Sequence, residues 1–334
     1  MSLTSDIRLE IEQMCEELGS NSMLVQGAGG NVSWKENDTL WVKASGTWLA
    51  NALTEDIFIG VNLENVKDKI SQGKFSDTPV FQASSGLRPS IETLLHALMP
   101  QKIVVHVHSV EALVALVRSD STQALCQKIS DSLNWCKVGY HKPGSELARS
   151  IAHELKESFE TNIVFMQNHG IVIGGESVFE VKNLLNEIVT SLQGNFIPET
   201  RKTLQPNPFP LSQYSLISDP YIQELALDPS LLAHVRCNWA ISPDHVVFLG
   251  SEPVIYEKLP GMHDSDAAEL IFIPNKGVFC RESFNATKLA QLRCYFDVMS
   301  RLPEGSNVTV LNDEDISDLL NWDAEKLRQS MAMD

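Results

Sequence analysis

Residues 102–109 read Lys-Ile-Val-Val-His-Val-His-Ser, an apolar, β-branched run that predicts a buried strand carrying two histidines. Because successive side chains of a strand point to opposite faces, His106 and His108 are expected to project to the same side. Two imidazoles at this spacing can reach one metal ion. The pattern also suits an ordinary buried strand with two structural histidines, so the pair alone leaves both interpretations open.

The composition bounds the kind of protein and its partners. The chain has 334 residues, of which 43% are hydrophobic, enough for one large domain and a smaller one with substantial cores. Acidic residues outnumber basic ones by 43 to 26, a net charge of −17. This balance argues against a nucleic-acid-binding or anionic-membrane surface, but a local site for an anionic small molecule is compatible with it. We therefore expect no nucleic-acid or membrane partner, and the charge balance does not exclude a small-molecule substrate.

The cysteines and the N-terminus indicate a cytoplasmic protein. The six cysteines are scattered without a CxxC pair, which is typical of reduced thiols rather than of a disulfide framework. The first twenty residues are acidic and amphipathic, unlike a signal peptide, and no apolar run is long enough to span a bilayer.

The hydrophobic pattern predicts a first domain over residues 1–195, in which helices and strands follow one another. Helices are expected over about 5–18, 62–72, 91–99, 110–118, 122–133, 145–158 and 178–192. Strands are expected over about 39–44, 57–61, 102–109, 135–140, 163–166 and 171–174, with residues 26–33 as a loop.

The second half of the chain has a different organisation. Residues 196–215 contain four prolines and little periodicity, which predicts a linker or an extended crossover. Residues 216–334 predict a smaller α+β extension. Its expected elements are helices over about 222–234, 286–300 and 324–331, a strand over 246–249 and a hairpin at 274–277.

Four short segments become informative when they are taken together. In chain order, they are Gly29-Gly30-Asn31-Val32-Ser33, Val42-Lys43-Ala44-Ser45-Gly46, Arg88-Pro89-Ser90-Ile91-Glu92-Thr93-Leu94-Leu95-His96, and the histidines His106, His108 and His169. In this order they resemble the class II aldolase/adducin family, which includes fuculose- and rhamnulose-phosphate aldolases and ribulose-phosphate 4-epimerases. The resemblance covers about residues 9–192 and implies an α/β fold, with an α-β-α layered domain around a central, mostly antiparallel sheet.

The resemblance implies a metal site and a catalytic acid/base. His106, His108 and His169 match the family's three metal ligands, and three neutral imidazoles leave an open position on Zn²⁺, as catalytic sites do. Another divalent transition metal also suits imidazole. Glu92 matches the catalytic acid/base, although without the resemblance it would be interpreted as a first-turn glutamate beside the helix dipole. His96, one helical turn later, is expected to be structural.

Five positions match residues that hold the substrate phosphate in the sugar-phosphate members. They are Gly30, Asn31, Ser45, Gly46 and Ser90. Glycine permits close backbone approach, and amides with hydroxyls can surround an anion. The family commonly has a second serine next to Ser90, where this chain has Ile91, so a substrate without phosphate stays open. Lys43 could neutralise an anion or simply lie on a strand face.

The implied function is a metal-dependent aldolase, a lyase of carbohydrate metabolism. It would cleave or form a C–C bond in a ketose or ketose phosphate through an enediolate held by the metal. A 4-epimerase or a dehydratase of the same superfamily is the alternative, although epimerases tend to have aspartate where Glu92 stands. A non-catalytic adducin-like scaffold is disfavoured because all three histidines are present. Sites in this family often lie between subunits of a cyclic tetramer, so we expect a homo-oligomer.

Two segments of the extension carry a narrower resemblance. They are Pro243-Asp244-His245-Val246-Val247-Phe248-Leu249 and Glu325-Lys326-Leu327-Arg328-Gln329. Both are similar to the tail that follows the aldolase half of bifunctional rhamnulose-phosphate aldolase/dehydrogenases. The resemblance implies no role for the extension.

Overall fold

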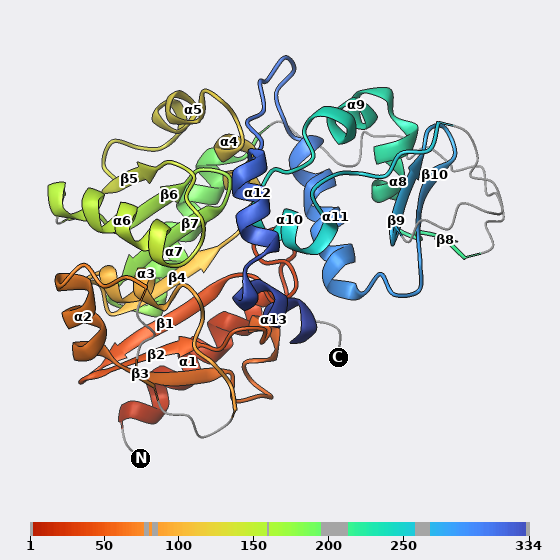
Figure 1. Cartoon of the computed structure of the whole chain (residues 1–334). Helices are drawn as coiled ribbons and strands as arrows, with labels where there is room; N and C mark the ends of the chain where they lie inside the picture. The colour runs from red at the N-terminus through yellow and green to blue at the C-terminus, as the bar shows by residue number, and fades with distance from the viewer. Residues whose placement is uncertain are drawn as a thin grey trace.

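A computed structural model describes residues 3–76, 80–81, 86–158, 160–194, 213–257 and 268–331. These residues contain a seven-stranded and a three-stranded sheet, with helices around both (Figure 1). Residues 196–212 of the predicted linker lie outside the described residues, and the domain limits proposed above stay predictions.

The large sheet belongs to the first part of the chain and has the strand order β3-β2-β1-β4-β7-β6-β5. Neighbouring strands are antiparallel except β5 and β6, which are parallel. The predicted, mostly antiparallel sheet is therefore confirmed. Its strands are β1 (Asn31–Glu36), β2 (Thr39–Lys43), β3 (Phe58–Asn62), β4 (Ile103–Val107), β5 (Trp135–Val138), β6 (Ile163–Met166) and β7 (Gly170–Gly175).

Helices cover both faces of this sheet and confirm the predicted α-β-α layers (Figure 1). One face packs against α1 (Leu3–Gly19), α4 (Val110–Leu116), α5 (Ser121–Lys128) and α7 (Val178–Leu192). The other packs against α2 (Leu63–Ser71), α3 (Thr93–Leu98) and α6 (Ser145–Glu157). A short 3₁₀ turn, η1 (Leu49–Asn51), contacts α1. Along β4, Ile103 and Val105 face the first layer while Val104 faces the second, so the alternation also directs His106 toward the second.

The predicted loop over residues 26–33 is only partly a loop, because β1 begins at Asn31. The strand pairs with β2 on one side and with β4 on the other. Val32 and Trp34 enter the core on one face. Strand formation here depends on partners on both sides, which outweigh the weak strand preference of a Gly-Gly-Asn start.

The C-terminal extension, residues 213–331 as described, is a smaller α+β unit that confirms the predicted class. A three-stranded antiparallel sheet has the order β8-β10-β9, and the predicted hairpin at residues 274–277 joins β9 to β10. Its strands are β8 (Ser215–Leu216), β9 (Leu270–Ile273) and β10 (Gly277–Cys280), and its helices are α8 (Pro220–Leu227), α9 (Pro229–Cys237), α10 (Pro243–Leu249), α11 (Ala286–Met299), α12 (Asp313–Leu320) and α13 (Asp323–Met331).

Two predictions for the extension are wrong. The expected strand over 246–249 is the helix α10, because Ser242 caps it by accepting a hydrogen bond from the His245 N–H and Pro243 occupies its first position. The expected helix over 222–234 is two helices, because Pro229 cannot continue α8. Asp228 ends α8 and caps α9 through the N–H groups of Ser230 and Leu231.

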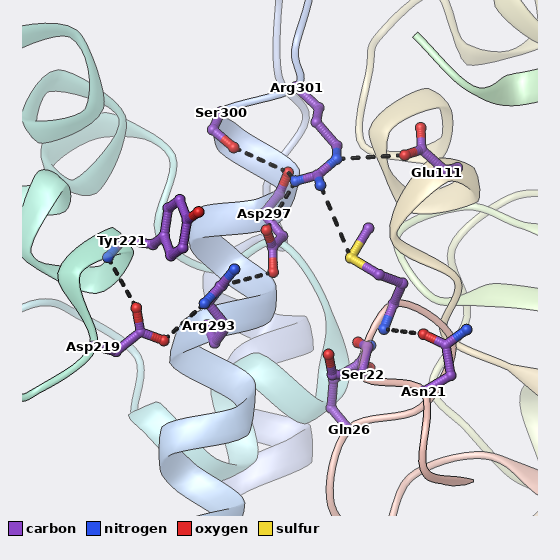
Figure 2. A network of polar contacts seen from close by, with 11 residues as sticks. Asn21, Ser22, Gln26, Glu111, Asp219, Tyr221, Arg293, Asp297, Ser300 and Arg301 are labelled. Carbon is purple, nitrogen blue, oxygen red and sulfur yellow. Dashed lines mark hydrogen bonds and ion pairs between the residues drawn. The ribbon is translucent and has the colours of Figure 1, made fainter. Parts of the chain in front are cut away.

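The extension is fastened to α4, the helix that follows the histidine strand. Apolar residues of α4 and α11 belong to one core cluster. Figure 2 shows the polar part of this junction, in which the guanidinium of Arg301, just after the end of α11, lies 3.4 Å from Glu111 of α4 and 2.8 Å from Asp297 of α11. Arg293, one turn before Asp297, pairs with Asp219 at 2.8 Å and so ties α11 to the start of α8. The extension therefore packs against the element next to the predicted metal ligands.

The described helices include none that is both long and apolar enough to cross a membrane.

Candidate metal centre

Three histidines meet at one end of the large sheet. His106 lies on β4, His108 follows the end of β4, and His169 lies in the turn between β6 and β7. Their ligand atoms all lie within 4.8 Å of one another, and all three residues are buried. The structure thus brings together the three residues that the sequence predicts as metal ligands.

The turn that carries His169 depends on two backbone positions beside it. Asn168 has a φ of +55°, in the left-handed region that asparagine tolerates. A Cβ atom on Gly170 would lie only 2.5 Å from the carbonyl oxygen of Val107, so a side chain there would push β7 away from the end of β4. Together these positions bring His169 against the two histidines of the strand.

The ring nitrogens are arranged so that Nε2 atoms face one another. The Nε2 atoms of His106 and His108 lie 3.0 Å apart. On the far side of the ring, Nδ1 of His106 donates a hydrogen bond of 3.0 Å to the carbonyl oxygen of Ile171, which can only accept. His106 therefore carries its proton on Nδ1, and the lone pair of Nε2 is available to a metal. Nδ1 of His108 lies 3.3 Å from Oδ2 of Asp244.

These donors fit a divalent transition metal. Two nitrogens bound to one tetrahedral Zn²⁺ at about 2.0–2.1 Å would lie roughly 3.3 Å apart. The two Nε2 atoms of the strand are 3.0 Å apart, which is close to this value. Burial lowers the pKa of His106, and it lowers the pKa of His169 to about 3. Both imidazoles are therefore neutral near pH 7, which is the form that binds metals.

Glu92 lies directly before α3 with its carboxylate against the histidines. Oε1 is 3.5 Å from Nε2 of His169, and Oε2 is 3.5 Å from Nε2 of His106. Asn31, the first residue of β1, donates a hydrogen bond of 2.9 Å to Oε2. Burial by itself raises the pKa of Glu92, but attraction by the neighbouring histidines outweighs it and lowers the pKa to about 2. An ionised carboxylate thus lies beside the nitrogen donors.

A cavity beside the histidines is lined by all five residues that match the phosphate-binding positions. These five are Gly30, Asn31, Ser45, Gly46 and Ser90, and the same lining includes Glu92, His108 and His169. Gly30 has a φ of +66°, and a Cβ atom there would lie 3.1 Å from the carbonyl oxygen of His106. Glycine therefore lets the backbone of this wall approach the histidine strand.

Lys43 brings a buried cation to the same cavity. The residue lies at the end of β2 and is 2% exposed. Its ammonium group donates hydrogen bonds to the carbonyl oxygens of Ala28 and Thr47, at 3.0 and 2.7 Å. Ile91, beside Ser90, lines the cavity as well, where the family pattern has a second hydroxyl.

His96 has a place outside this centre. Its Nδ1 atom lies 2.8 Å from the hydroxyl oxygen of Ser33, a hydrogen bond that links α3 to β1. The residue is fully buried and is not among the residues that line the cavity. This position agrees with the structural role expected for it.

One residue at the centre, Asp244, was missed by the sequence analysis. It lies in the first turn of α10 and lines the cavity together with His108 and His169. The sequence Ser242-Pro243 is a helix-start signal that would have placed Asp244 on a first turn. No local pattern, however, indicates a contact between residues so far apart in the chain.

Known proteins are similar to the first part of the chain. The sequence model of the Class II Aldolase and Adducin N-terminal domain matches residues 10–195. A curated relative, the uncharacterized oxidoreductase YuxG of Bacillus subtilis (strain 168), is 30% identical over 177 residues, covering 48% of this chain and 25% of that protein. The chain thus spans about a quarter of the length of this relative.

Two solved structures also resemble the chain over 57% of its length. The N-terminal class II aldolase domain of a conserved protein from Thermoplasma acidophilum is 26% identical, with a TM-score of 0.47 and 94% of its own chain covered. The sugar-phosphate aldolase from Thermotoga maritima is 14% identical, with a TM-score of 0.45 and 94% of its chain covered.

Proposed function

The chain belongs to the family of class II aldolases and adducins, and on this premise we propose that it is a metal-dependent lyase. It would cleave or form a C–C bond in a ketose or ketose phosphate. The observation that carries the proposal is that a carboxylate, Glu92, lies 3.5 Å from Nε2 of both His106 and His169. A non-catalytic scaffold would not need a carboxylate buried among three buried imidazoles.

We propose His106, His108 and His169 as the ligands of a divalent transition metal, with Zn²⁺ as the first candidate. Three imidazole ligands suit zinc and leave one position for substrate. When bound, such a metal would supply Lewis-acid polarisation of a substrate carbonyl. Burial lowers the pKa of His106 and of His169, which keeps these two imidazoles in the neutral form that binds metals.

The part of Glu92 in this chemistry is to move a proton. Oε2 is engaged by Asn31, whereas Oε1 has no hydrogen-bond partner among the described residues. In the condensation direction, Oε1 would take a proton from the carbon next to the substrate carbonyl. In the cleavage direction, it would return that proton to the same carbon. A positioned carboxylate contributes about 10²–10⁴-fold through this kind of catalysis.

The cavity favours an anionic sugar. Lys43 supplies a buried ammonium group, and Ser45 and Ser90 supply hydroxyls in the same cavity. Because Ile91 supplies no hydroxyl, a substrate phosphate would depend on these three side chains and on the backbone at Gly46. Hydrogen bonds to a charged group contribute about 1.5–3 kcal/mol each, which is enough to prefer a phosphorylated ketose over the free sugar.

The test is a screen of the Zn²⁺-loaded protein against ketose 1-phosphates and free ketoses, with release of an aldehyde as the readout. We expect release from at least one ketose 1-phosphate, and none from the same substrate with the Glu92→Gln variant. A product epimerised at C4 without released fragments would instead assign an epimerase, and loss of water would assign a dehydratase. Absence of any conversion across the panel would contradict the lyase.

A further inference from the structure

The C-terminal extension reaches the metal centre through one carboxylate. Oδ2 of Asp244, on α10, lies 3.3 Å from Nδ1 of His108. We propose that Asp244 is a positioning residue, through which the extension completes the metal centre within the same chain. This inference rests on the proposed metal-binding function of the three histidines.

The site of contact is built from three segments of the chain. Asp244 lies in the first turn of α10 and is 4% exposed. The side-chain amide of Gln291, on α11, lies 3.4 Å from the same Oδ2 atom and donates to it. Gly29 forms the opposite wall, because a Cβ atom there would lie 3.1 Å from Oδ2 of Asp244 and 3.2 Å from Nδ1 of His108. The carboxylate is therefore enclosed against the back of the imidazole.

The position of Asp244 determines which ring nitrogen of His108 is available to a metal. A carboxylate accepts a hydrogen bond and cannot donate one, so it favours the tautomer of His108 with the proton on Nδ1. The lone pair of Nε2 is then directed to the side where Nε2 of His106 lies, 3.0 Å away. The negative charge also makes the imidazole a stronger donor, and loss of such a partner typically weakens metal binding about 10–100-fold.

A second contact ties the extension to the turn that holds His169. The side-chain amide of Asn168 donates hydrogen bonds to the carbonyl oxygens of Ile241 and Thr309, at 2.9 and 2.8 Å. Ile241 lies just before α10 and Thr309 just before α12, so both acceptors belong to the extension. The extension thus supports His169 through its neighbour, while Asp244 supports His108 directly.

The junction between the two parts keeps these contacts in place. Glu111 of α4 pairs with Arg301, which follows the end of α11 (Figure 2), and α4 begins two residues after His108. Gln291, which contacts Asp244, lies on α11 together with Asp297, the other partner of Arg301. The helix α11, which packs against α4, therefore also supports Asp244 through Gln291.

The experiment compares the Zn²⁺ affinity of the full chain with that of Asp244→Ala and Asp244→Asn, by competition with a chromogenic chelator. We expect a loss of about 10–100-fold for Asp244→Ala. A smaller loss is expected for Asp244→Asn, because its amide oxygen can still accept a hydrogen bond from the Nδ1–H group of His108 although it carries no charge.

Ser242→Ala serves as the matched control, because it removes the cap of α10 without touching His108. It should lower the stability of the fold and leave the Zn²⁺ affinity unchanged. A loss of affinity as large as that of Asp244→Ala would mean that loosening α10 is enough, and would overturn the proposal. Failure of both Asp244 variants to fold would also overturn it, since Asp244 would then serve the fold.

Zn²⁺ binding by the unaltered protein separates the proposed metal site from the proposed role of Asp244. If the unaltered protein binds no Zn²⁺, the proposed metal function is wrong. If it binds Zn²⁺ and both Asp244 variants bind equally tightly, only the positioning role is wrong.

Discussion

The side-chain amide of Asn31 donates a hydrogen bond of 2.9 Å to Oε2 of Glu92, and this contact divides the carboxylate into a held oxygen and an available one. Oε1 faces Nε2 of His169 at 3.5 Å and has no hydrogen-bond partner among the described residues. The base proposed for this chain is therefore fixed in direction by the first residue of β1.

Replacement of Glu92 by glutamine should separate chemistry from metal binding. Glutamine keeps the shape of the side chain and its contact with Asn31, but its amide cannot take a proton at neutral pH. We expect turnover to fall by about 10²–10⁴-fold while the metal content stays that of the unaltered protein. Steady-state kinetics with parallel elemental analysis measures both quantities. Undiminished turnover would refute the role of Glu92.

Replacement of Lys43 by methionine should weaken binding of anions. Loss of a hydrogen bond to a charged group costs about 1.5–3 kcal/mol, so the inhibition constant for inorganic phosphate should rise by roughly 10–100-fold. The control is Lys35→Met on β1, because Lys35 also donates to a backbone carbonyl but does not line the cavity. If both variants bind phosphate as the unaltered protein does, Lys43 is not part of the anion site.

Replacement of Gly170 by alanine should disturb the histidine turn. The added Cβ atom would lie 2.5 Å from the carbonyl oxygen of Val107, so β7 must shift and carry His169 with it. We expect the free energy of unfolding to fall by about 1–3 kcal/mol, together with weaker Zn²⁺ binding. Gly139→Ala is the matched control, because its Cβ atom would meet nothing within 4 Å. Equal behaviour of the two variants would argue against the strict need for glycine at 170.

The stability of the metal-free protein should decrease as the pH falls below about 6.5. His245 packs between Trp239 and Tyr295, and burial lowers its pKa to about 3. The folded state therefore binds fewer protons than the unfolded state between these pH values, so stability present above pH 6.5 is lost on acidification. One such histidine contributes a loss of about 2 kcal/mol between pH 7 and pH 5.

Urea unfolding of the metal-free protein at pH 7, 6 and 5 measures this dependence. His96 and His169 also have a pKa lowered to about 3, so the free energy of unfolding of any single variant will still depend partly on pH. His245→Leu should remove the share of one histidine. A variant with an unchanged dependence on pH would show that His245 is protonated in the folded protein.

Much of the centre could be predicted because its signals are local. Strand alternation places His106 and His108 on one side, and the family pattern adds His169. The order of the four segments then indicated Glu92 and the five positions that match a phosphate site. The structure places all of them around one cavity. Local periodicity with a family pattern was enough for these residues.

The rest depends on contacts between distant parts of the chain. β1 is a strand because β2 and β4 flank it, and the sequence of residues 26–33 does not encode those partners. The β-branched run over 246–249 is a helix because its start is capped by Ser242. Asp244 meets His108 only after the extension has docked on α4, so no spacing in the sequence could reveal it.

The central claim is that His106, His108 and His169 hold one divalent metal. The most direct measurement is elemental analysis of the purified, Zn²⁺-loaded protein beside its His169→Ala variant, after extensive dialysis. The account predicts about one metal ion per chain in the unaltered protein and a large loss in the variant. Absence of stoichiometric metal in the unaltered protein, or equal metal in the variant, would contradict it.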